Sequence, residues 1–216
     1  MRHPWKRRAG LVAVTTVTIA AAVACGGHGP AADPTRAPSA AAGTPGPSAS
    51  KATGKQDVAQ WAPQVTAYAK KAAVDPRLLM AILYNESYKP HDPELERAWQ
   101  RLKPDSAFGI ANMHKAAFDD TKPGRFADRD WQELPDDPKL AVEAAAWYLH
   151  DLAAQLPSSP SGTYTRNELL ALGYNAGAGN MLAFARGAKP GSMAQSYLDR
   201  LHQNWDKAGE AVGKRG

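Results

Sequence analysis

The chain has 216 residues, with 26 Lys and Arg against 21 Asp and Glu. Four of the basic residues precede Gly10, and the rest of the chain is nearly neutral, with 22 basic against 21 acidic residues. The chain also has no stripe of Lys and Arg interleaved with aromatic residues, so we expect no nucleic-acid partner.

The N-terminus predicts an export signal. An apolar run over residues 11–23 is too short for an ordinary membrane span. It follows a positive region that holds four basic residues, Arg2, Lys6, Arg7 and Arg8. We therefore predict a signal peptide over residues 1–24 and an extracytoplasmic protein. The Arg7-Arg8 pair also permits the twin-arginine route, although the general secretory route is favoured.

Cys25 is the only cysteine, so no internal disulfide is expected. It follows Ala22-Val23-Ala24, which resembles a lipobox, in which the cysteine thiol is lipidated. Ala22 stands where a lipobox usually has Leu, and the Ala-x-Ala pattern is also that of ordinary signal-peptidase cleavage. We favour a lipoprotein that is anchored in the cell membrane through lipid on Cys25.

After Cys25, residues 26–56 are mostly Gly, Ala, Pro, Ser and Thr. Such a segment has too few large apolar side chains to offset the entropy of ordering, so residues 25–56 are predicted to be the lipidated cysteine and a disordered linker. Residues 57–216 are long enough for one domain. Its first helix is predicted from four residues that share a face, Trp61, Val65, Tyr68 and Ala72.

The next helix is expected to begin near Pro76, because Asp75 is a plausible N-cap and Pro is favoured at the first helical position. Leu79, Ile82 and Leu83 form its apolar stripe, and Glu86 falls on the same stripe. A desolvated carboxylate there disfavours the charged form, so Glu86 is a candidate proton donor. The alternative is a helix-end glutamate that reaches solvent or pairs with a basic residue.

Four further helices are predicted along the chain. Asp92 opens a short one from Pro93 to Leu102, in a middle segment that is otherwise irregular. Asp137-Pro138 opens a long helix that ends before Pro157. Residues 165–168 form a capping box for the next helix, and the last is marked by Tyr197, Leu201 and Trp205. No long alternating run predicts a large sheet.

Three separated motifs resemble those of the soluble lytic transglycosylase (SLT) domain, the family that shares its fold with goose-type lysozyme. They are Asp75 to Ser87, Ser106 to Asn112 and Gly173 to Gly177, in the order and spacing of that family. The resemblance covers residues 57–207. It implies a mainly α, lysozyme-like domain with a substrate cleft and little or no β-structure.

The resemblance also implies a peptidoglycan lytic transglycosylase, a lyase that cleaves glycan strands at the MurNAc-GlcNAc β-1,4 bond. Glu86 would be the catalytic acid and base, and a 1,6-anhydro end would form without water or cofactor. The substrate-binding residues implied are Ser87, Ser106, Gly109, Asn112, Tyr174 and Asn175. Gly109 would let the backbone approach the sugar, and Tyr174 would orient Glu86 or the substrate.

The sequence departs from the family pattern in two places. Ala111-Asn112 replaces Met-Gln, and Gly173 stands where Ala is frequent. Two alternatives stay open: a hydrolytic muramidase, with a second carboxylate among Asp92, Asp105, Asp119 and Asp120, and an inactive wall-binding lipoprotein. No histidine pair has the spacing of a zinc site, so no metal is expected. For Trp99, Trp131 and Trp147, core packing is favoured over sugar stacking.

Overall fold

The computed structural model describes residues 57–88 and 91–213, which belong to one compact unit, residues 50–216. The predicted signal peptide, Cys25 and the whole predicted linker lie outside these residues, and those predictions stay untested. Within the two described stretches, no helix combines the length and the hydropathy needed to cross a membrane.

The described residues form helices and no strand, apart from one isolated antiparallel bridge between Phe108 and Met113. The predicted mainly α, lysozyme-like fold is therefore confirmed. The helices are α1 (Ala62–Lys71), α2 (Pro76–Glu86), α3 (Pro93–Leu102), α4 (Lys115–Thr121), α5 (Pro138–Gln155), α6 (Arg166–Ala176), α7 (Ala178–Ala185) and α8 (Ser192–Gly213), with two short 3-10 turns, Val58–Trp61 and Trp131–Glu133.

Helix α2 lies at the centre of the domain. It begins where predicted, because the Asp75 side chain accepts a hydrogen bond from the Arg77 backbone N–H at 2.8 Å. Every residue from Leu78 to Glu86 is buried. Buried Asn85 joins α2 to α8: its amide donates to the Tyr197 carbonyl at 3.0 Å, and its carbonyl accepts from Asn204 at 2.8 Å. The C-terminal end of α2 is thereby fixed against α8.

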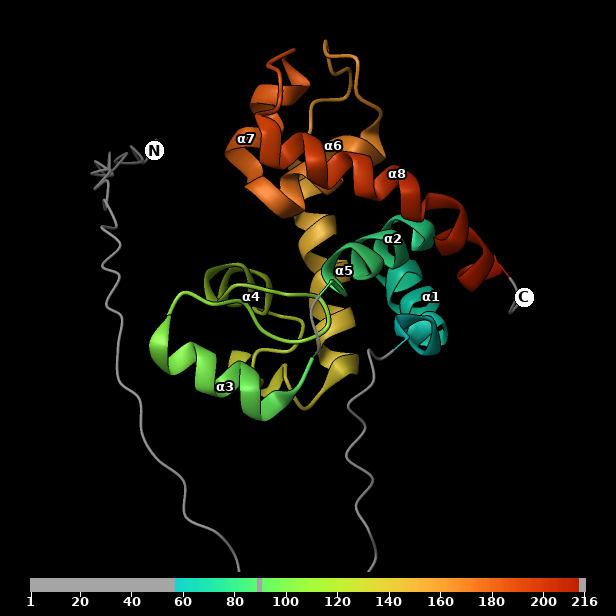
Figure 1. The fold of residues 1–216 in the computed structure, drawn as a ribbon. Coiled ribbons are helices and arrows are strands. Elements are labelled where there is room, and N and C mark those ends of the chain that lie inside the picture. Colours follow the sequence, from blue (N-terminus) through green and yellow to red (C-terminus); the bar gives the residue numbers. More distant parts are fainter. Residues whose placement is uncertain (1–56, 89–90, 214–216) are drawn as a thin grey trace, which may run out of the picture. The chain divides into compact units, whose positions relative to one another are not determined.

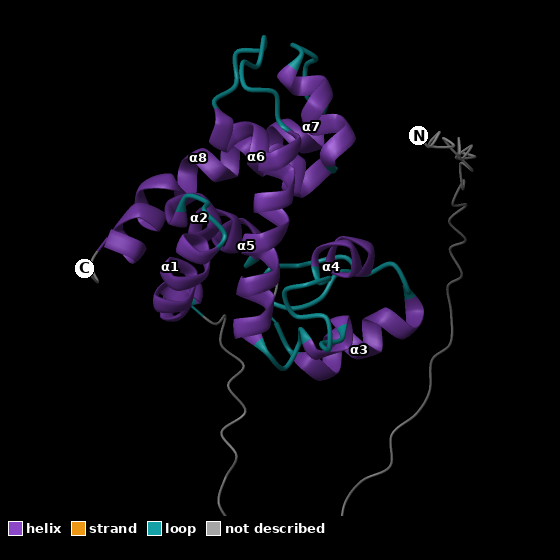
Figure 2. Ribbon diagram, turned by 180° about the vertical axis from the view of Figure 1, so that it is seen from behind, coloured by secondary structure: helices purple, strands orange, loops and turns teal. Residues whose placement is uncertain are grey.

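Helix α5 separates two groups of elements (Figure 1). Helices α1 and α2 lie on one side of it, and α3, α4 and their connecting loops lie on the other; the view from behind agrees (Figure 2). The predicted capping box of α6 is present, with Thr165 and Glu168 each accepting from the other's backbone N–H. Helix α6 ends at Gly177, which has φ +84°, so the Tyr174-Asn175 motif lies in its last turn.

Helix α3 has the predicted bounds but an unexpected orientation. It buries Glu96 while Leu95, Trp99 and Leu102 are 65%, 52% and 76% exposed. Helix α3 thus places apolar side chains in solvent and a carboxylate in the interior, whereas an ordinary surface helix buries its apolar stripe. Core packing is confirmed for Trp131, which is buried and stacks on Phe108 at a centroid distance of 4.2 Å, and is wrong for Trp99, whose side chain is exposed.

Candidate active site

Glu86 ends α2, with only 6% of its surface exposed. Each of its carboxylate oxygens accepts a hydrogen bond: Oε1 from the Tyr197 hydroxyl at 2.9 Å, and Oε2 from the Asn112 side-chain amide at 3.0 Å. The predicted desolvation of Glu86 is therefore confirmed, and the alternative of a solvent-facing side chain is wrong. Its two donors come from distant parts of the chain, helix α8 and a loop in the middle segment.

A tight hairpin presents Asn112 to Glu86. Phe108 and Met113 exchange backbone hydrogen bonds of 3.1 and 2.9 Å, and the Asn112 N–H donates to the Gly109 carbonyl at 2.9 Å. Gly109 and Asn112 both have positive φ, +70° and +48°. Asn is one of the few residues other than Gly that tolerate this left-handed conformation. The replacement of the family's Gln by Asn112 thus suits the backbone that aims the amide at Glu86.

A neighbouring loop leaves no room for a side chain at Gly109. A Cβ atom at this position would lie 2.7 Å from the backbone oxygen of Leu134, far inside van der Waals contact. The left-handed φ adds a second constraint on side chains here. The family resemblance predicts that Gly109 lets the backbone approach the sugar closely, and that contact stays a prediction.

Tyr197 contacts the candidate catalytic residue, although the sequence pattern does not predict this contact. Its side chain is 2% exposed, and its hydroxyl reaches Glu86 from a position 111 residues further along the chain. The sequence indicated it only as part of the apolar stripe of the last helix. The one available signal was Asn85, a polar residue in an otherwise apolar helix beside Glu86, whose amide holds the Tyr197 backbone.

Tyr174 supports the hairpin and not the carboxylate directly. Its hydroxyl donates to the Ala111 carbonyl at 2.8 Å, and its ring meets the Tyr148 ring edge-on with centroids 5.5 Å apart. Burial, with the nearby Glu86 carboxylate, raises the pKa of both the Tyr174 and Tyr197 hydroxyls well above 10. Both phenols therefore stay protonated hydrogen-bond donors throughout the physiological pH range.

These raised pKa values predict a loss of stability at alkaline pH. Tyrosine in an unfolded chain ionises near pH 10, about its usual pKa, so the stabilisation from keeping a phenol neutral is complete below about pH 10 and lost above it. We expect the thermal unfolding midpoint to fall above about pH 10. Tyr197→Phe should show a smaller fall across the same buffers. An identical pH dependence in the variant and the wild type would contradict this origin.

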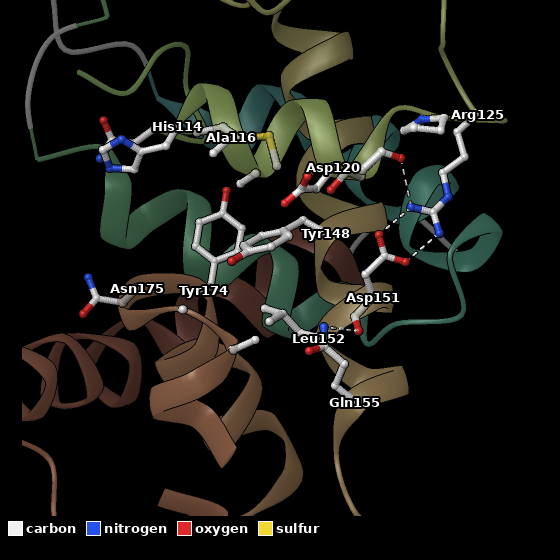
Figure 3. Close-up of a pocket in the computed structure, with 17 residues that line it drawn as sticks. His114, Ala116, Asp120, Arg125, Tyr148, Asp151, Leu152, Gln155, Tyr174 and Asn175 are labelled. Atoms are coloured by element: carbon white, nitrogen blue, oxygen red, sulfur yellow. Dashed lines mark hydrogen bonds and ion pairs between the residues drawn. The ribbon is translucent and has the colours of Figure 1, made fainter. Parts of the chain in front are cut away.

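A cavity of about 770 Å³ adjoins Asn112, the donor to Glu86 Oε2, whereas Glu86 and Tyr197 are not among the residues that line it. Tyr174 and Asn175 line one part of it (Figure 3). Arg125 and Asp151 line another, joined by two hydrogen bonds of 2.6 Å. A second hollow of about 900 Å³ lies between the end of α6 and the start of α8, and exposed Asn175 lines this one too. The two hollows make room for an extended ligand on both sides of Asn175.

The two motif serines are occupied by backbone contacts. Ser87 is the C-cap of α2 and its hydroxyl donates to the Tyr84 carbonyl at 2.9 Å, while the Ser106 hydroxyl donates to the Lys103 carbonyl. Neither serine lines the two hollows described above. Because each hydroxyl hydrogen is already used, either serine would meet a substrate as an acceptor. Their predicted contact with substrate stays a prediction.

Gly173 departs from the family pattern for a steric reason. A Cβ atom on Gly173 would lie 2.7 Å from the Met181 sulfur, so the buried methionine of α7 occupies the space that an alanine would need. Helix α7 therefore packs closely on α6 just before Tyr174. The contact between α6 and α7 therefore explains why this position is glycine.

A family model, the Transglycosylase SLT domain, matches residues 63–192, from the start of α1 to the first residue of α8. The chain belongs to this family. Members of the SLT family are peptidoglycan lytic transglycosylases with a lysozyme-like helical fold. The matched residues include Glu86, the hairpin and the Tyr174-Asn175 motif, whereas Tyr197 lies just beyond them. Neither a search of curated proteins nor a search of solved structures gave a significant match.

Proposed function

We propose that this SLT domain is a lytic transglycosylase that cleaves the MurNAc-GlcNAc β-1,4 bond of peptidoglycan with Glu86 as its acid and base. The observation that supports this most is the environment of Glu86: a buried carboxylate with a hydrogen-bond donor on each oxygen. One of those donors, Asn112, also lines the cavity of about 770 Å³. A space that is large enough for sugar residues therefore begins at the side chain that donates to Glu86.

In this reaction the protonated Glu86 carboxyl gives its proton to the leaving glycosidic oxygen as the C1–O bond breaks. Tyr197 and Asn112 then stabilise the carboxylate that this transfer leaves. The C6 hydroxyl of the same MurNAc residue attacks C1 and closes the 1,6-anhydro ring. Its proton passes to the Glu86 carboxylate, which restores the acid. No water is consumed, and the intramolecular hydroxyl has a high effective concentration.

A hydrolytic muramidase is the second candidate, because one of the four aspartates considered lines the cavity. Asp120 is that residue, and its charge contributes to the raised pKa of the neighbouring Tyr148 hydroxyl. The Asp92 side chain caps α3 and that of Asp119 pairs with Lys115, while Asp105 is exposed and does not line the cavity. A base for water activation would thus be Asp120.

The products of a peptidoglycan digest distinguish these reactions. We expect residues 50–216, the compact unit, to release soluble fragments whose MurNAc ends resist borohydride reduction, because an anhydro ring has no free aldehyde. Reducible ends that disappear with Asp120→Asn would instead support the muramidase. Binding to the insoluble wall without any released fragment would support the wall-binding lipoprotein.

We also propose that the protein is an extracytoplasmic lipoprotein, anchored in the membrane through lipid on Cys25. The support is the basic and apolar leader that precedes the single cysteine. The polar linker would then let the domain sample the wall above the membrane. Radiolabelled palmitate should label the full chain and not Cys25→Ala, and equal labelling would contradict the proposal.

A further inference from the structure

Helix α3 places a carboxylate inside the protein and its apolar side chains outside. Glu96 is 8% exposed, whereas Leu95 and Trp99, its neighbours on the helix, are more than half exposed. Burial of a charged carboxylate is unfavourable unless hydrogen bonds compensate. Both oxygens of Glu96 have such partners: Oε1 lies 2.8 Å from the His91 Nδ1, and Oε2 accepts from the Gly109 backbone N–H at 2.8 Å.

The contact with Gly109 connects Glu96 to the active site. Gly109 begins the hairpin turn, and its carbonyl accepts the Asn112 N–H that closes the turn. The Asn112 side chain then donates to Glu86. Three hydrogen bonds, with Gly109 and Asn112 between them, therefore connect the Glu96 carboxylate of α3 to the Glu86 carboxylate of α2.

Three side chains hold the hairpin from different directions. Tyr174 donates to the Ala111 carbonyl at 2.8 Å, and the Trp131 Nε1 donates to the Met113 carbonyl at 2.8 Å. Glu96 holds the first residue of the turn, and of the three it alone is a carboxylate, which makes the stronger, charge-assisted type of hydrogen bond. Glu96 therefore fixes the end of the turn that the two aromatic residues leave unattached.

We infer that Glu96 is a positioning residue of this active site: its buried carboxylate fixes the Gly109 turn and thereby aims the Asn112 amide at Glu86. This inference rests on the proposed function for its effect on catalysis. This role would explain the orientation of α3, in which Glu96 faces inward and the apolar side chains are exposed. His91 takes the remaining carboxylate oxygen and keeps the side chain in that orientation.

The first test compares Glu96→Ala, Glu96→Gln and the matched control Glu94→Ala, an exposed glutamate of the same helix. Glu96→Ala should lower kcat by at least about tenfold with little change in KM, because a misdirected donor to the acid affects the chemical step. Glu96→Gln should retain most of kcat, since its amide oxygen still accepts the Gly109 N–H. Glu94→Ala should match the wild type.

A double-mutant cycle with Asn112→Ala separates positioning from general stabilisation. If Glu96 acts through Asn112, then Glu96→Ala should lower kcat no further in the Asn112→Ala background. Independent effects that simply multiply would overturn the inference, because they would mean that Glu96 only supports the fold.

A readout without catalysis keeps the inference testable even if the domain proves inactive. The side-chain amide resonances of ¹⁵N-labelled Asn112, assigned by their loss in Asn112→Ala, should shift in Glu96→Ala and stay in place in Glu94→Ala. If Glu96→Ala does not fold, Glu96→Asp, which withdraws the carboxylate by one methylene, should give the same shift. Unmoved resonances would overturn the inference, whereas a shift in a domain that cleaves nothing would support it and contradict the proposed function alone.

Discussion

Glu86→Gln is expected to reduce the rate of peptidoglycan cleavage by about a thousandfold, within the usual range for loss of a general acid and base. The amide has nearly the same size and shape but can neither give nor take the proton that the reaction needs. Tyr197 can still donate to the amide oxygen, so the side chain should stay in place. The rate of release of soluble fragments from the insoluble wall measures the loss.

The control for this variant is Glu94→Gln, which changes the same functional group on an exposed face of α3. It should cleave at the wild-type rate. Both variants should bind the insoluble wall as the wild type does, because binding does not use the proton. A Glu86→Gln enzyme that keeps more than about a tenth of the wild-type rate would contradict the assignment of Glu86, since general acid-base catalysis contributes at least about a hundredfold.

Gly109→Ala is expected to have the largest effect on stability. The added methyl group would meet the Leu134 backbone oxygen at 2.7 Å, and the residue would also be held at φ +70°. The left-handed backbone alone costs about 1 to 2 kcal/mol for an L-residue, and the clash with rigid backbone adds to this. Cleavage should fall as well, because the hairpin that carries Asn112 must move away from Glu86.

Gly124 supplies a matched control, because its φ of +74° is nearly the same and an added methyl group would meet no atom within 4 Å beyond its own chain neighbours. Gly124→Ala should therefore lower the free energy of unfolding only by the cost of the left-handed backbone, about 1 to 2 kcal/mol, and the variant should keep its activity. Urea unfolding of the two variants measures the difference in the free energy of unfolding. Equal losses in both would mean that the approach to Leu134 is not a constraint on Gly109.

Local signals in the sequence predicted most helices well. The Asp-Pro pairs at 75–76, 92–93 and 137–138 each place a capping side chain before a favoured first residue, and each is where a helix begins. Helices α4 and α7 lack a side-chain cap, so their starts carried no comparable signal. They form because tertiary packing, as of Phe118 and Met181 in the core, outweighs weak local preference.

The candidate site was less predictable than the fold, because its geometry depends on contacts between distant residues. Burial of Glu86 followed from helical periodicity alone. Tyr197, in contrast, looks like any core aromatic until α8 is placed on α2, and the turn at Gly109 depends on Leu134 and Glu96 in other segments. The substrate-binding role of Asn112 stays a prediction, and its contact with Glu86 has no signal in the sequence.

Digestion of purified peptidoglycan in H₂¹⁸O by residues 50–216, with mass spectrometry of the fragments, tests the central proposal most directly. We predict fragments with 1,6-anhydro ends, one water lighter than the hydrolytic products and without ¹⁸O, that Glu86→Gln does not release. Fragments that each carry one ¹⁸O at a reducing MurNAc end would contradict the proposal, because water and not the C6 hydroxyl would then have attacked C1.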